Sequence, residues 1–582
     1  MVQRGDTPTA EPVAAHGAVG TGVDAGDRSV AAARRGGDRL LVLATGLAAA
    51  LPVLVAIVHQ LWVDWVPLGD DAIIAVRSFE VLSSDPPLVG MPAGGATGVL
   101  HEQAYHLGPL LFWLLSVPSR YLHPSLLPVT VGLVNVACVV GIVAIARRRG
   151  GRALMFVVAA GLALTLSSIP AIAHAAVWNP AAAFLPFTLL VFVAWSIACG
   201  EYRLLPVAVL AASFAAQCHL TYVLPSLTAL VVGLVGLAVA WRRGRLAPGR
   251  PGVWVAVAAL VAVVCWSAPA VQQLRDDPGN LTVLRRAGTS ADPKLGSKVG
   301  ERAVAHAIGV APWWVDSPRG ALKRIGELSV SPGALRTVST FAVLAALAAL
   351  ALLGLRRRRS DVVAACVLSL ALVAALGVAA SSVPKTAFGT VGYSLWWASA
   401  VGLFAWVTMG WSAATLFALG RRLPSVSRPA LAGAAGVAVV AAVGVVVAVD
   451  ANRRDEPIDQ MRTVSDRLQA VLPAGRAVRV DAPNPTDVFS AAGFQLGIVY
   501  AMRRDGRDVQ APSVARYLGD RYRRDDSANP AIVNVDVDRP PIPGSRVVAR
   551  VSFDDRDPDN PFSKAPPTRT VTVSLPPLAA AP

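Results

Sequence analysis

Two adjacent carboxylates, Asp70 and Asp71, stand just past the first apolar stretch that is long enough to cross a bilayer. Pro67 and Gly69 end the continuation of that stretch. Aspartates at such a point can simply cap the next helix, because anionic groups are favoured at the positive end of its dipole. A carboxylate at the lipid boundary that is partly withdrawn from water can also act as a general base on a hydroxyl group. The pair is therefore the first candidate catalytic site.

The residues after this pair predict an amphipathic helix. Ile74, Arg77 and Val81 fall near helical spacing. Such a helix is expected to lie at the membrane face, with its carboxylate end at the mouth of a helical bundle. Arg77 on this helix, Glu80 near its far end and Glu102 in the following loop are candidate substrate-binding residues.

Further polar residues lie between the apolar stretches or at their ends. A polar side chain at such a depth is costly unless it faces a cavity, so these residues are candidates for substrate binding. A lone His or Tyr at the end of a span can equally be an interfacial residue with satisfied hydrogen bonds. All of them fall on the predicted side of Asp70, which favours a shared cavity. They are His106, His174, Asn179, His219, Tyr222, Lys385 and Tyr393.

The composition is that of a polytopic membrane protein. Hydrophobic residues make up 54% of the 582 positions and charged residues 15%, whereas soluble proteins carry roughly 25% charged residues. The formal net charge is +16, but Lys and Arg occur largely as short clusters between apolar runs, at 147–149, 242–245, 356–359 and 421–422. Short basic loops mark the cytoplasmic side of a membrane, so this charge does not indicate nucleic-acid binding.

Motifs of several other functional classes are absent from the sequence. The five cysteines lie inside apolar stretches, without the spacing of a zinc site or a disulfide framework. No phosphate-binding loop, dinucleotide-binding glycine pattern or HExxH motif occurs, which removes support for nucleotide-driven transport and zinc proteolysis. The sequence identifies no cofactor. The aspartate pair can bind a divalent metal ion, although two acids alone make a weak site.

Three regions follow from the distribution of apolar and charged residues. Residues 1–38 are predicted to form a disordered cytoplasmic tail, 39–450 a helical transmembrane domain, and 451–582 a small extracytoplasmic α/β domain. The domain at 451–582 is expected to contain helices at 457–472 and 487–503, and strands at 477–481, 531–537, 546–553 and 570–575.

About eleven membrane-spanning helices are expected within the transmembrane domain. The stretch 108–122 is short for a span and is broken by Pro118, so we expect an amphipathic or half-inserted helix there. Two long outer loops, 62–124 and 272–336, then share one side with the C-terminal domain. The spans are predicted at 40–61, 126–146, 153–168, 180–199, 204–217, 222–241, 253–271, 337–355, 362–380, 393–419 and 430–449.

The order of elements around Asp70 resembles that of the C-type glycosyltransferase (GT-C) superfamily, which includes protein O-mannosyltransferases and the lipid A aminoarabinose transferase. The resemblance covers 40–240 by pattern and the rest by architecture. It implies a helical membrane enzyme that transfers a sugar from a polyprenyl-phosphate donor on the outer face, with inversion, Asp70 as base and Asp71 as its acidic neighbour. The matching pieces are Asp70-Asp71, Glu80, His106-Leu107-Gly108-Pro109-Leu110, and Arg147-Arg148-Arg149 followed by Gly150-Gly151.

One position departs from the family pattern. Several relatives carry a lysine, thought to contact the donor phosphate, where this chain has His106. We therefore expect a different cation to hold the phosphate. The candidates are Arg77, Lys385 and the arginines of the basic outer loop 272–336.

These features favour a membrane glycosyltransferase. Its partners would be the polyprenyl-phosphate sugar donor, membrane lipids and an envelope glycan, lipid or protein as acceptor. It would lie in a bacterial plasma membrane with a cytoplasmic N-terminus; heavy use of Ala, Val, Gly and Arg is typical of a high-GC bacterium such as an actinobacterium. One alternative is a transporter or flippase of lipid-linked sugar, which should show repeated halves. The other is a non-catalytic envelope scaffold.

Overall fold

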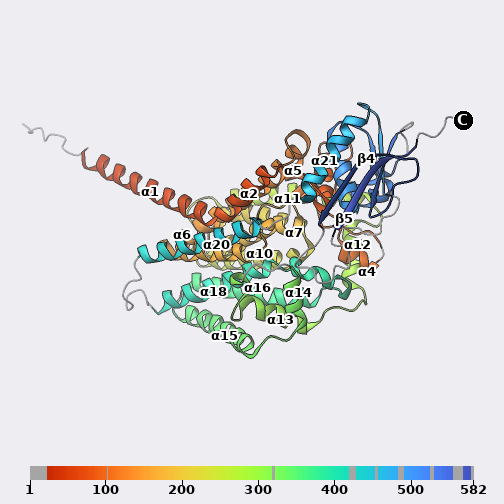
Figure 1. The fold of residues 1–582 in the computed structure, drawn as a ribbon. Helices are drawn as coiled ribbons and strands as arrows, with labels where there is room; N and C mark the ends of the chain where they lie inside the picture. Colours follow the sequence, from red (N-terminus) through yellow and green to blue (C-terminus); the bar gives the residue numbers. More distant parts are fainter. Residues whose placement is uncertain are drawn as a thin grey trace, which may run out of the picture.

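The computed structural model describes residues 22–100, 102–316, 321–417, 428–451, 456–482, 491–524, 530–554 and 568–577. These residues form a bundle of apolar helices with a small sheet at one end (Figure 1). The predicted fold class, a mainly α membrane protein with a small C-terminal α/β unit, is confirmed. Helix α1 (Gly22–Ala49) starts within the segment that we predicted to be a disordered tail, so 22–38 are helical. Residues 1–21 lie outside the described part.

Seven helices in the described part are long and apolar enough to cross a membrane. The end of α1 together with α2 (Leu51–Trp62) makes an eighth, which is bent by 58°. Two shorter apolar helices, Tyr202–Cys218 and Ala432–Gly444, coincide with the predicted spans 204–217 and 430–449. The seven helices that are long and apolar enough to cross a membrane are α6 (Leu126–Ser167), α7 and α8 (Asn179–Ala198), η3 and α10 (Leu220–Arg242), α11 (Pro251–Arg275), α15 (Ala334–Arg356), α16 (Ser360–Ser381) and α18 (Trp397–Leu416).

Helix α6 contains two of the predicted spans. A straight helix of its 42 residues would be about 63 Å long, roughly twice the thickness of the hydrocarbon layer. The backbone leaves helical geometry at Gly150 and Gly151. Asn135 donates to the carbonyl of His174 at 2.8 Å, and the His174 ring contacts the carbonyl of Leu166 at 2.9 Å. Residues on both sides of the glycines therefore reach the same end of the bundle, as in a helical hairpin.

The hairpin turn depends on glycine at position 151, which has φ +72° and ψ −164°. Side chains are essentially excluded from this region, so Gly151→Ala is expected to lose about 1–3 kcal/mol of stability. A Cβ at this position would meet no atom within 4 Å, which makes the effect one of backbone conformation alone. Gly252→Ala in helix α11 is the matched control, because Gly252 also has free space and needs no positive φ. Thermal unfolding of both variants in detergent tests the difference, and equal melting temperatures would contradict it.

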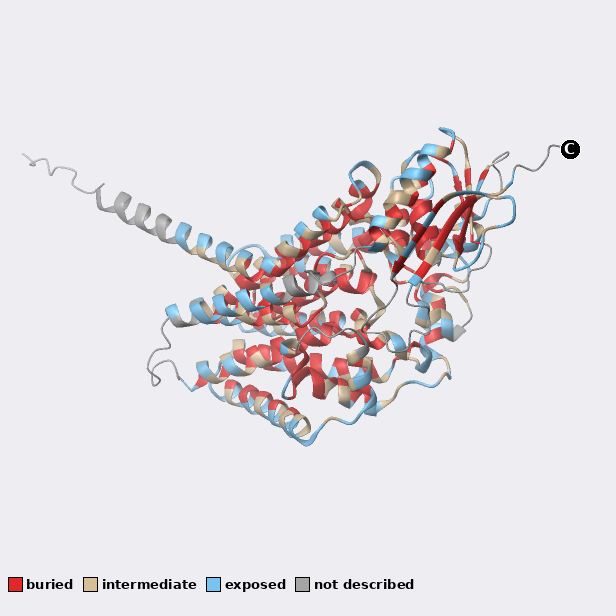
Figure 2. Cartoon of the chain, in the orientation of Figure 1, coloured by how far each residue is buried: buried red, intermediate tan, exposed pale blue. Residues whose placement is uncertain are grey.

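Large apolar side chains cover the outside of the bundle. Leu260 and Val263 of α11 are 63% and 67% exposed, and Phe341 of α15 is 67% exposed. By contrast, 94% of the α7 and α8 span is buried. Figure 2 shows the buried residues running through the bundle and into the sheet. Exposed apolar surface of this extent indicates contact with lipid, so the chain is a multi-pass membrane protein.

Three of the basic clusters, at 147–149, 242–245 and 356–359, meet at one end of the bundle, as the charge pattern predicts. The fourth, at 421–422, lies outside the described residues. Polar contacts join the first three to the neighbouring loops and to one another. This end is expected to face the cytoplasm because short basic loops remain on that side. The contacts are those of Arg147 with Asp38 (2.6 Å), Arg148 with Glu201 (3.0 Å), Arg245 with Ser360 (3.3 Å) and Arg357 with the carbonyl of Leu416.

Short helices that do not cross the membrane fill the opposite end. One of them, α5 (Leu110–Tyr121), occupies the stretch predicted to be amphipathic or half-inserted and packs against α3 (Gly69–Glu80). The two outer loops are tied together by Asn280, whose amide exchanges hydrogen bonds of 2.9 and 3.1 Å with the backbone of Tyr105. The other short helices are α4 (Gly94–Leu100), α12 (Asn280–Thr289), α13 (Ser297–Ile308), α14 (Ala321–Ser329), η5 (Lys385–Thr390) and α17 (Val391–Ser394).

The described part of the C-terminal unit is a five-stranded sheet in the order β2-β1-β3-β5-β4 with three α-helices. Strand β1 pairs in parallel with β2 and β3, whereas β3, β5 and β4 pair antiparallel. The four predicted strands are confirmed, and β2 was not predicted. The elements are α21 (Glu456–Val471), β1 (Val478–Asp481), α22 (Ala491–Arg504), β2 (Val509–Gln510), α23 (Ala515–Leu518), η7 (Asp520–Arg523), β3 (Ala531–Val537), β4 (Arg546–Asp554) and β5 (Thr568–Leu575).

Candidate active site

A cavity of about 830 Å³ lies at the end of the bundle opposite the basic clusters. Both outer loops, the outer ends of several spans and the C-terminal unit contribute to its wall. Of the sequence candidates, it brings together residues whose positions differ by more than 300: Asp70, His106, Asn179, His219 and Tyr393. The predicted shared cavity thus contains five of the twelve candidate side chains.

Asp70 occupies the first turn of α3. Gly69 before it has φ +55°, a conformation that favours glycine and lets the chain turn sharply into the helix. The Oδ2 atom of Asp70 accepts a hydrogen bond of 3.1 Å from the indole of Trp178. Trp178 is itself held by the ring of Tyr393, at 4.6 Å between ring centroids. The carboxylate is therefore fixed in place and open to the cavity.

The surroundings of Asp70 strengthen it as a base. Burial by the surrounding protein raises the pKa of the Asp70 carboxyl, and the Trp178 hydrogen bond opposes this rise only in part. Burial together with the nearby charge of Asp70 raises the pKa of Tyr393 to about 12. A carboxylate with a raised pKa accepts a proton more readily, when it is ionised, than an ordinary carboxylate does.

Two histidines of the cavity wall pack against each other, with the ring centroids of His106 and His219 4.6 Å apart. Burial lowers the pKa of His219 to about 4, and burial with the neighbouring ring lowers that of His106 well below its usual value. Both rings are thus neutral at pH 7. Nδ1 of His106 accepts from the backbone N–H of Leu220 at 3.2 Å, which leaves its Nε2–H to donate. These side chains can donate hydrogen bonds to a substrate, but they supply no positive charge.

Lys294 supplies the positive charge. It is the one lysine or arginine among the described residues that line the cavity. Its Nζ donates to the carbonyl of Gly288 at 3.1 Å, and its backbone pairs with that of Pro384 as an isolated bridge. Asp292 also lines the cavity, next to Ser290 at 3.2 Å. We expected the basic outer loop to offer an anion site, yet the sequence did not single out this lysine.

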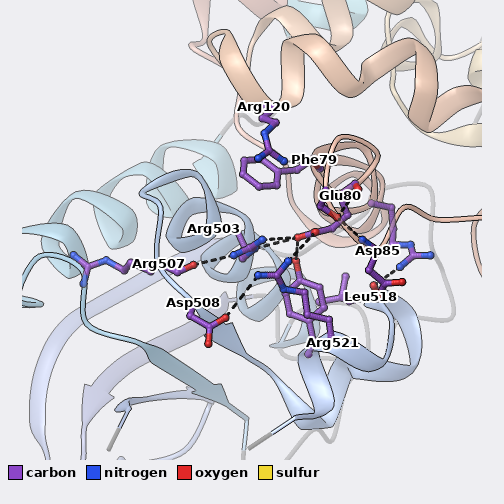
Figure 3. A network of polar contacts seen from close by, with 12 residues as sticks. Phe79, Glu80, Asp85, Arg120, Arg503, Arg507, Asp508, Leu518 and Arg521 are labelled. Carbon is purple, nitrogen blue, oxygen red and sulfur yellow. Dashed lines mark hydrogen bonds and ion pairs between the residues drawn. The ribbon is translucent and has the colours of Figure 1, made fainter. Parts of the chain in front are cut away.

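Arg77 and Glu80 do not line the cavity. The Nη1 atom of Arg77 donates to the carbonyl of Leu518 at 2.5 Å. Glu80, 2% exposed, pairs with Arg503 at 2.9 Å (Figure 3). Both side chains therefore point from α3 to the C-terminal unit, away from the space where a substrate would lie.

His174 and Tyr222 are buried against backbone. The ring of His174 bonds the carbonyl of Leu166, and the hydroxyl of Tyr222 donates to the carbonyl of Pro180 at 2.9 Å. Neither side chain lines the cavity. His174 thus contacts the end of α6, and Tyr222, which directly precedes α10, contacts the backbone of Pro180. Both side chains make contacts within the bundle and do not face the cavity.

Three remaining candidates also lie outside the cavity wall. Glu102 is 3.9 Å from Arg286, with both side chains partly exposed. Lys385 is exposed, and its backbone N–H donates to the carbonyl of Pro293 at 2.9 Å. Asp71 follows Asp70 on the helix but does not reach the cavity. Among the described residues, no group of three or more His, Cys, Asp or Glu side chains could hold a metal ion.

Comparisons with known proteins give structural similarity only. No protein-family model and no curated protein matches the chain. The chain is similar to the crystal structure of ArnT from Cupriavidus metallidurans bound to undecaprenyl phosphate, with 14% identity, a TM-score of 0.48, and coverage of 90% of this chain and 97% of that chain. It is also similar to the oligosaccharyltransferase AglB from Archaeoglobus fulgidus, in complex with an inhibitory peptide and a dolichol-phosphate, with 13% identity, a TM-score of 0.26, and coverage of 74% and 62%.

Proposed function

We propose that the chain is a membrane glycosyltransferase that moves a sugar from a polyprenyl-phosphate donor to a hydroxyl group of a cell-envelope acceptor. The observation that carries this proposal is the position of Asp70. Its carboxylate opens into a large cavity at the end of the helical bundle, and Lys294 lines the same cavity. A base and a cation are the groups that this transfer needs most.

The proposed reaction is a single inverting displacement. Asp70 takes the proton from the acceptor hydroxyl as the hydroxyl oxygen bonds to the anomeric carbon. The bond between that carbon and the phosphate oxygen breaks on the opposite face, and its electrons leave with the phosphate. Lys294 stabilises the charge on the departing group. The phosphate is a good leaving group, so no general acid is required.

The wall of the cavity also fits a lipid-linked donor. Leu224 of α10 and Ala379 of α16 line it, and both belong to membrane-spanning helices. Leu284 and Val383 add further apolar surface to the wall. A polyprenyl chain can pack against these side chains while its phosphate lies at the lysine and its sugar near Asp70.

The proposed orientation places this cavity on the outer face of a bacterial plasma membrane. The basic clusters at the opposite end would face the cytoplasm, as would the N-terminus. The membrane domain, 39–450, would then present its outer loops to the extracytoplasmic domain, 451–582. Labelling of cysteines introduced singly at Asp520 and at Arg243 with a membrane-impermeant reagent tests this, because only the first should react in intact cells.

The acceptor and the sugar can be identified together by mass spectrometry of envelope glycans from a deletion strain. A missing sugar that returns on expression of the chain would support the proposal. Purified protein in vesicles with the corresponding lipid-linked sugar then separates the alternatives. An enzyme is expected to transfer the sugar with cleavage of the sugar-phosphate bond. Movement of the intact lipid would indicate a flippase. If neither transfer nor movement is observed, the non-catalytic scaffold is the remaining alternative.

The pH dependence of transfer should report on Asp70. Only the ionised carboxylate can take a proton, so kcat/KM should fall as the pH drops through the pKa of Asp70. Because that pKa is raised, the fall should occur at higher pH than for an ordinary aspartate. Trp178→Phe removes the N–H that favours the ionised form and should move the fall to still higher pH. A shift in the opposite direction, or none, would contradict this account.

A further inference from the structure

Helix α3 connects the cavity with the C-terminal unit. Asp70 lies in its first turn, and Glu80 is its last residue. Ten residues of helix separate them by about 15 Å along the axis. The two carboxylates thus occupy opposite ends of one rigid element, and only the first opens into the cavity.

Glu80 is held by three side chains of the C-terminal unit. Oε1 accepts from Arg503 at 2.9 and 3.1 Å and from the hydroxyl of Tyr522 at 2.8 Å, and Oε2 lies 3.4 Å from Arg521. Figure 3 shows both arginines converging on Glu80. Burial favours the neutral acid, but the charge of Arg503 and the hydrogen bonds outweigh it and lower the pKa of Glu80. The carboxylate is therefore ionised, and both of its oxygens have partners in the C-terminal unit.

The orientation of Arg503 is fixed as well. Its Nη1 donates to the carbonyl of Arg507 at 3.0 Å, and its guanidinium lies 5.3 Å from the centre of the Phe79 ring. Arg521 also reaches Asp508 at 3.8 Å. The contact with Glu80 is thus one part of a network that belongs to α22 and the loop after it.

Further contacts fix the rest of α3. Arg77, one turn before Glu80, donates to the carbonyl of Leu518. Ser119 of α5 donates to the carbonyl of Ala75 at 2.7 Å, and its own carbonyl accepts from Tyr500 of α22 at 3.1 Å. The height and rotation of α3 are therefore set by α5 together with residues after position 490.

The same unit reaches the cavity itself. Leu496 of α22 and Tyr517 of α23 line it beside Asp70. A Cβ placed on Gly493 would lie 3.5 Å from the backbone nitrogen of Gly69, so α22 also packs closely on the start of α3. The C-terminal unit thus touches α3 at both ends.

We propose that Glu80 is a positioning residue for the transfer reaction. Through Arg503, Arg521 and Tyr522 it holds α3 at the rotation and height that bring Asp70 to the acceptor hydroxyl, so the C-terminal unit is part of the active site. This inference rests on the proposed role of Asp70. Glu80 touches no substrate and acts only through the helix. A displacement of about 1 Å at a reacting group can lower a rate by about 10²-fold.

The test compares Glu80→Gln with Asp520→Asn in the full-length protein. Asp520 pairs with Arg523 on the same unit, but both side chains are largely exposed, at 85% and 65%. Product formed per folded molecule is measured with the lipid-linked form of the sugar that the envelope-glycan analysis identifies, and binding of undecaprenyl phosphate is measured separately. Glu80→Gln should lower product formation by about 10- to 100-fold. Lipid binding and the Asp520→Asn control should stay unchanged.

Hydrogen exchange separates positioning from a purely structural role. Backbone amides of residues 72–76 should exchange faster in Glu80→Gln, and Glu80→Asp, which keeps the charge, should recover part of the activity. If Glu80→Gln only reduces the amount of folded protein and each folded molecule keeps full activity, the inference is wrong. If Glu80→Gln fails to fold, Tyr522→Phe takes its place, because it removes only one hydrogen bond to Glu80. This variant should show a smaller fall in the same direction, and full activity would overturn the inference.

The outcome for Asp70→Asn distinguishes this inference from the proposed function. Loss of product in Asp70→Asn with full activity in Glu80→Gln would overturn the positioning role alone. Full activity in Asp70→Asn would overturn Asp70 as the base, and the role of Glu80 would fall with it. Loss of product in both, with lipid binding intact, is the expected result.

Discussion

Asp70→Asn should lower the turnover of lipid-linked sugar by about 10²- to 10⁴-fold, the range that a general base contributes. Asparagine has nearly the shape of aspartate and its amide oxygen can still accept from Trp178, so the start of α3 should remain folded. The amide cannot take the proton of the acceptor hydroxyl. The measurement is single-turnover transfer with purified protein, which separates the chemical step from substrate binding.

Asp71→Asn is the matched variant. It makes the same chemical change one residue later, on a side chain that does not line the cavity. The resemblance places an acidic neighbour at this position, so a modest effect through Asp70 is consistent with the proposal. Equal losses in the two variants would instead indicate that the pair acts as a unit, and near-normal turnover in both would show that the mechanism is wrong.

The sequence indicated those cavity residues whose side of the membrane follows from the order of the spans along the chain. Asp70, Asn179, His219 and Tyr393 each follow or precede an apolar stretch, and the basic clusters assign all of these ends to one side. Polar residues at the same ends of packed helices are brought within reach of one another. The distribution of charge therefore contained enough information to place them in one cavity.

The sequence could not show where a side chain points when its partner lies far along the chain. Arg77 and Glu80 stand on the helix that carries Asp70, so the pattern suggested substrate binding. Their partners are Leu518, Arg503 and Tyr522, more than 420 positions away. Only the packing of the C-terminal unit on α3 shows that they face away from the cavity.

A similar difficulty explains why the sequence indicated Lys385, and not Lys294, as a phosphate contact. Lys385 lies in a short outer loop and was an expected phosphate contact, whereas Lys294 was one of several basic residues in a long loop. The backbone bridge between Lys294 and Pro384 brings these two loops together, and the lysine of the longer loop lines the cavity. This pairing has no signal in composition or periodicity.

Lys294→Gln should lower kcat by about 10²- to 10³-fold, because removing one group that stabilises developing negative charge has an effect of this size. The charge on the phosphate oxygen grows as its bond to the sugar breaks, and Lys294 is the one lysine or arginine on the described cavity wall. Lys294→Arg keeps the charge and should recover part of the rate, although its planar group differs in shape from an ammonium. Steady-state kinetics of transfer and direct binding of undecaprenyl phosphate measure both effects.

Two other lysines make this prediction specific. Lys298→Gln removes an exposed positive charge from the start of α13, four residues away and outside the cavity wall, and should leave kcat unchanged. Lys385→Gln tests the contact expected from sequence alone. If Lys385→Gln is impaired and Lys294→Gln is not, the phosphate lies on the other side of the bridge between the two loops. If only Lys294→Gln is impaired, a cation contributed by the long outer loop performs the role that the family pattern assigns to the position of His106.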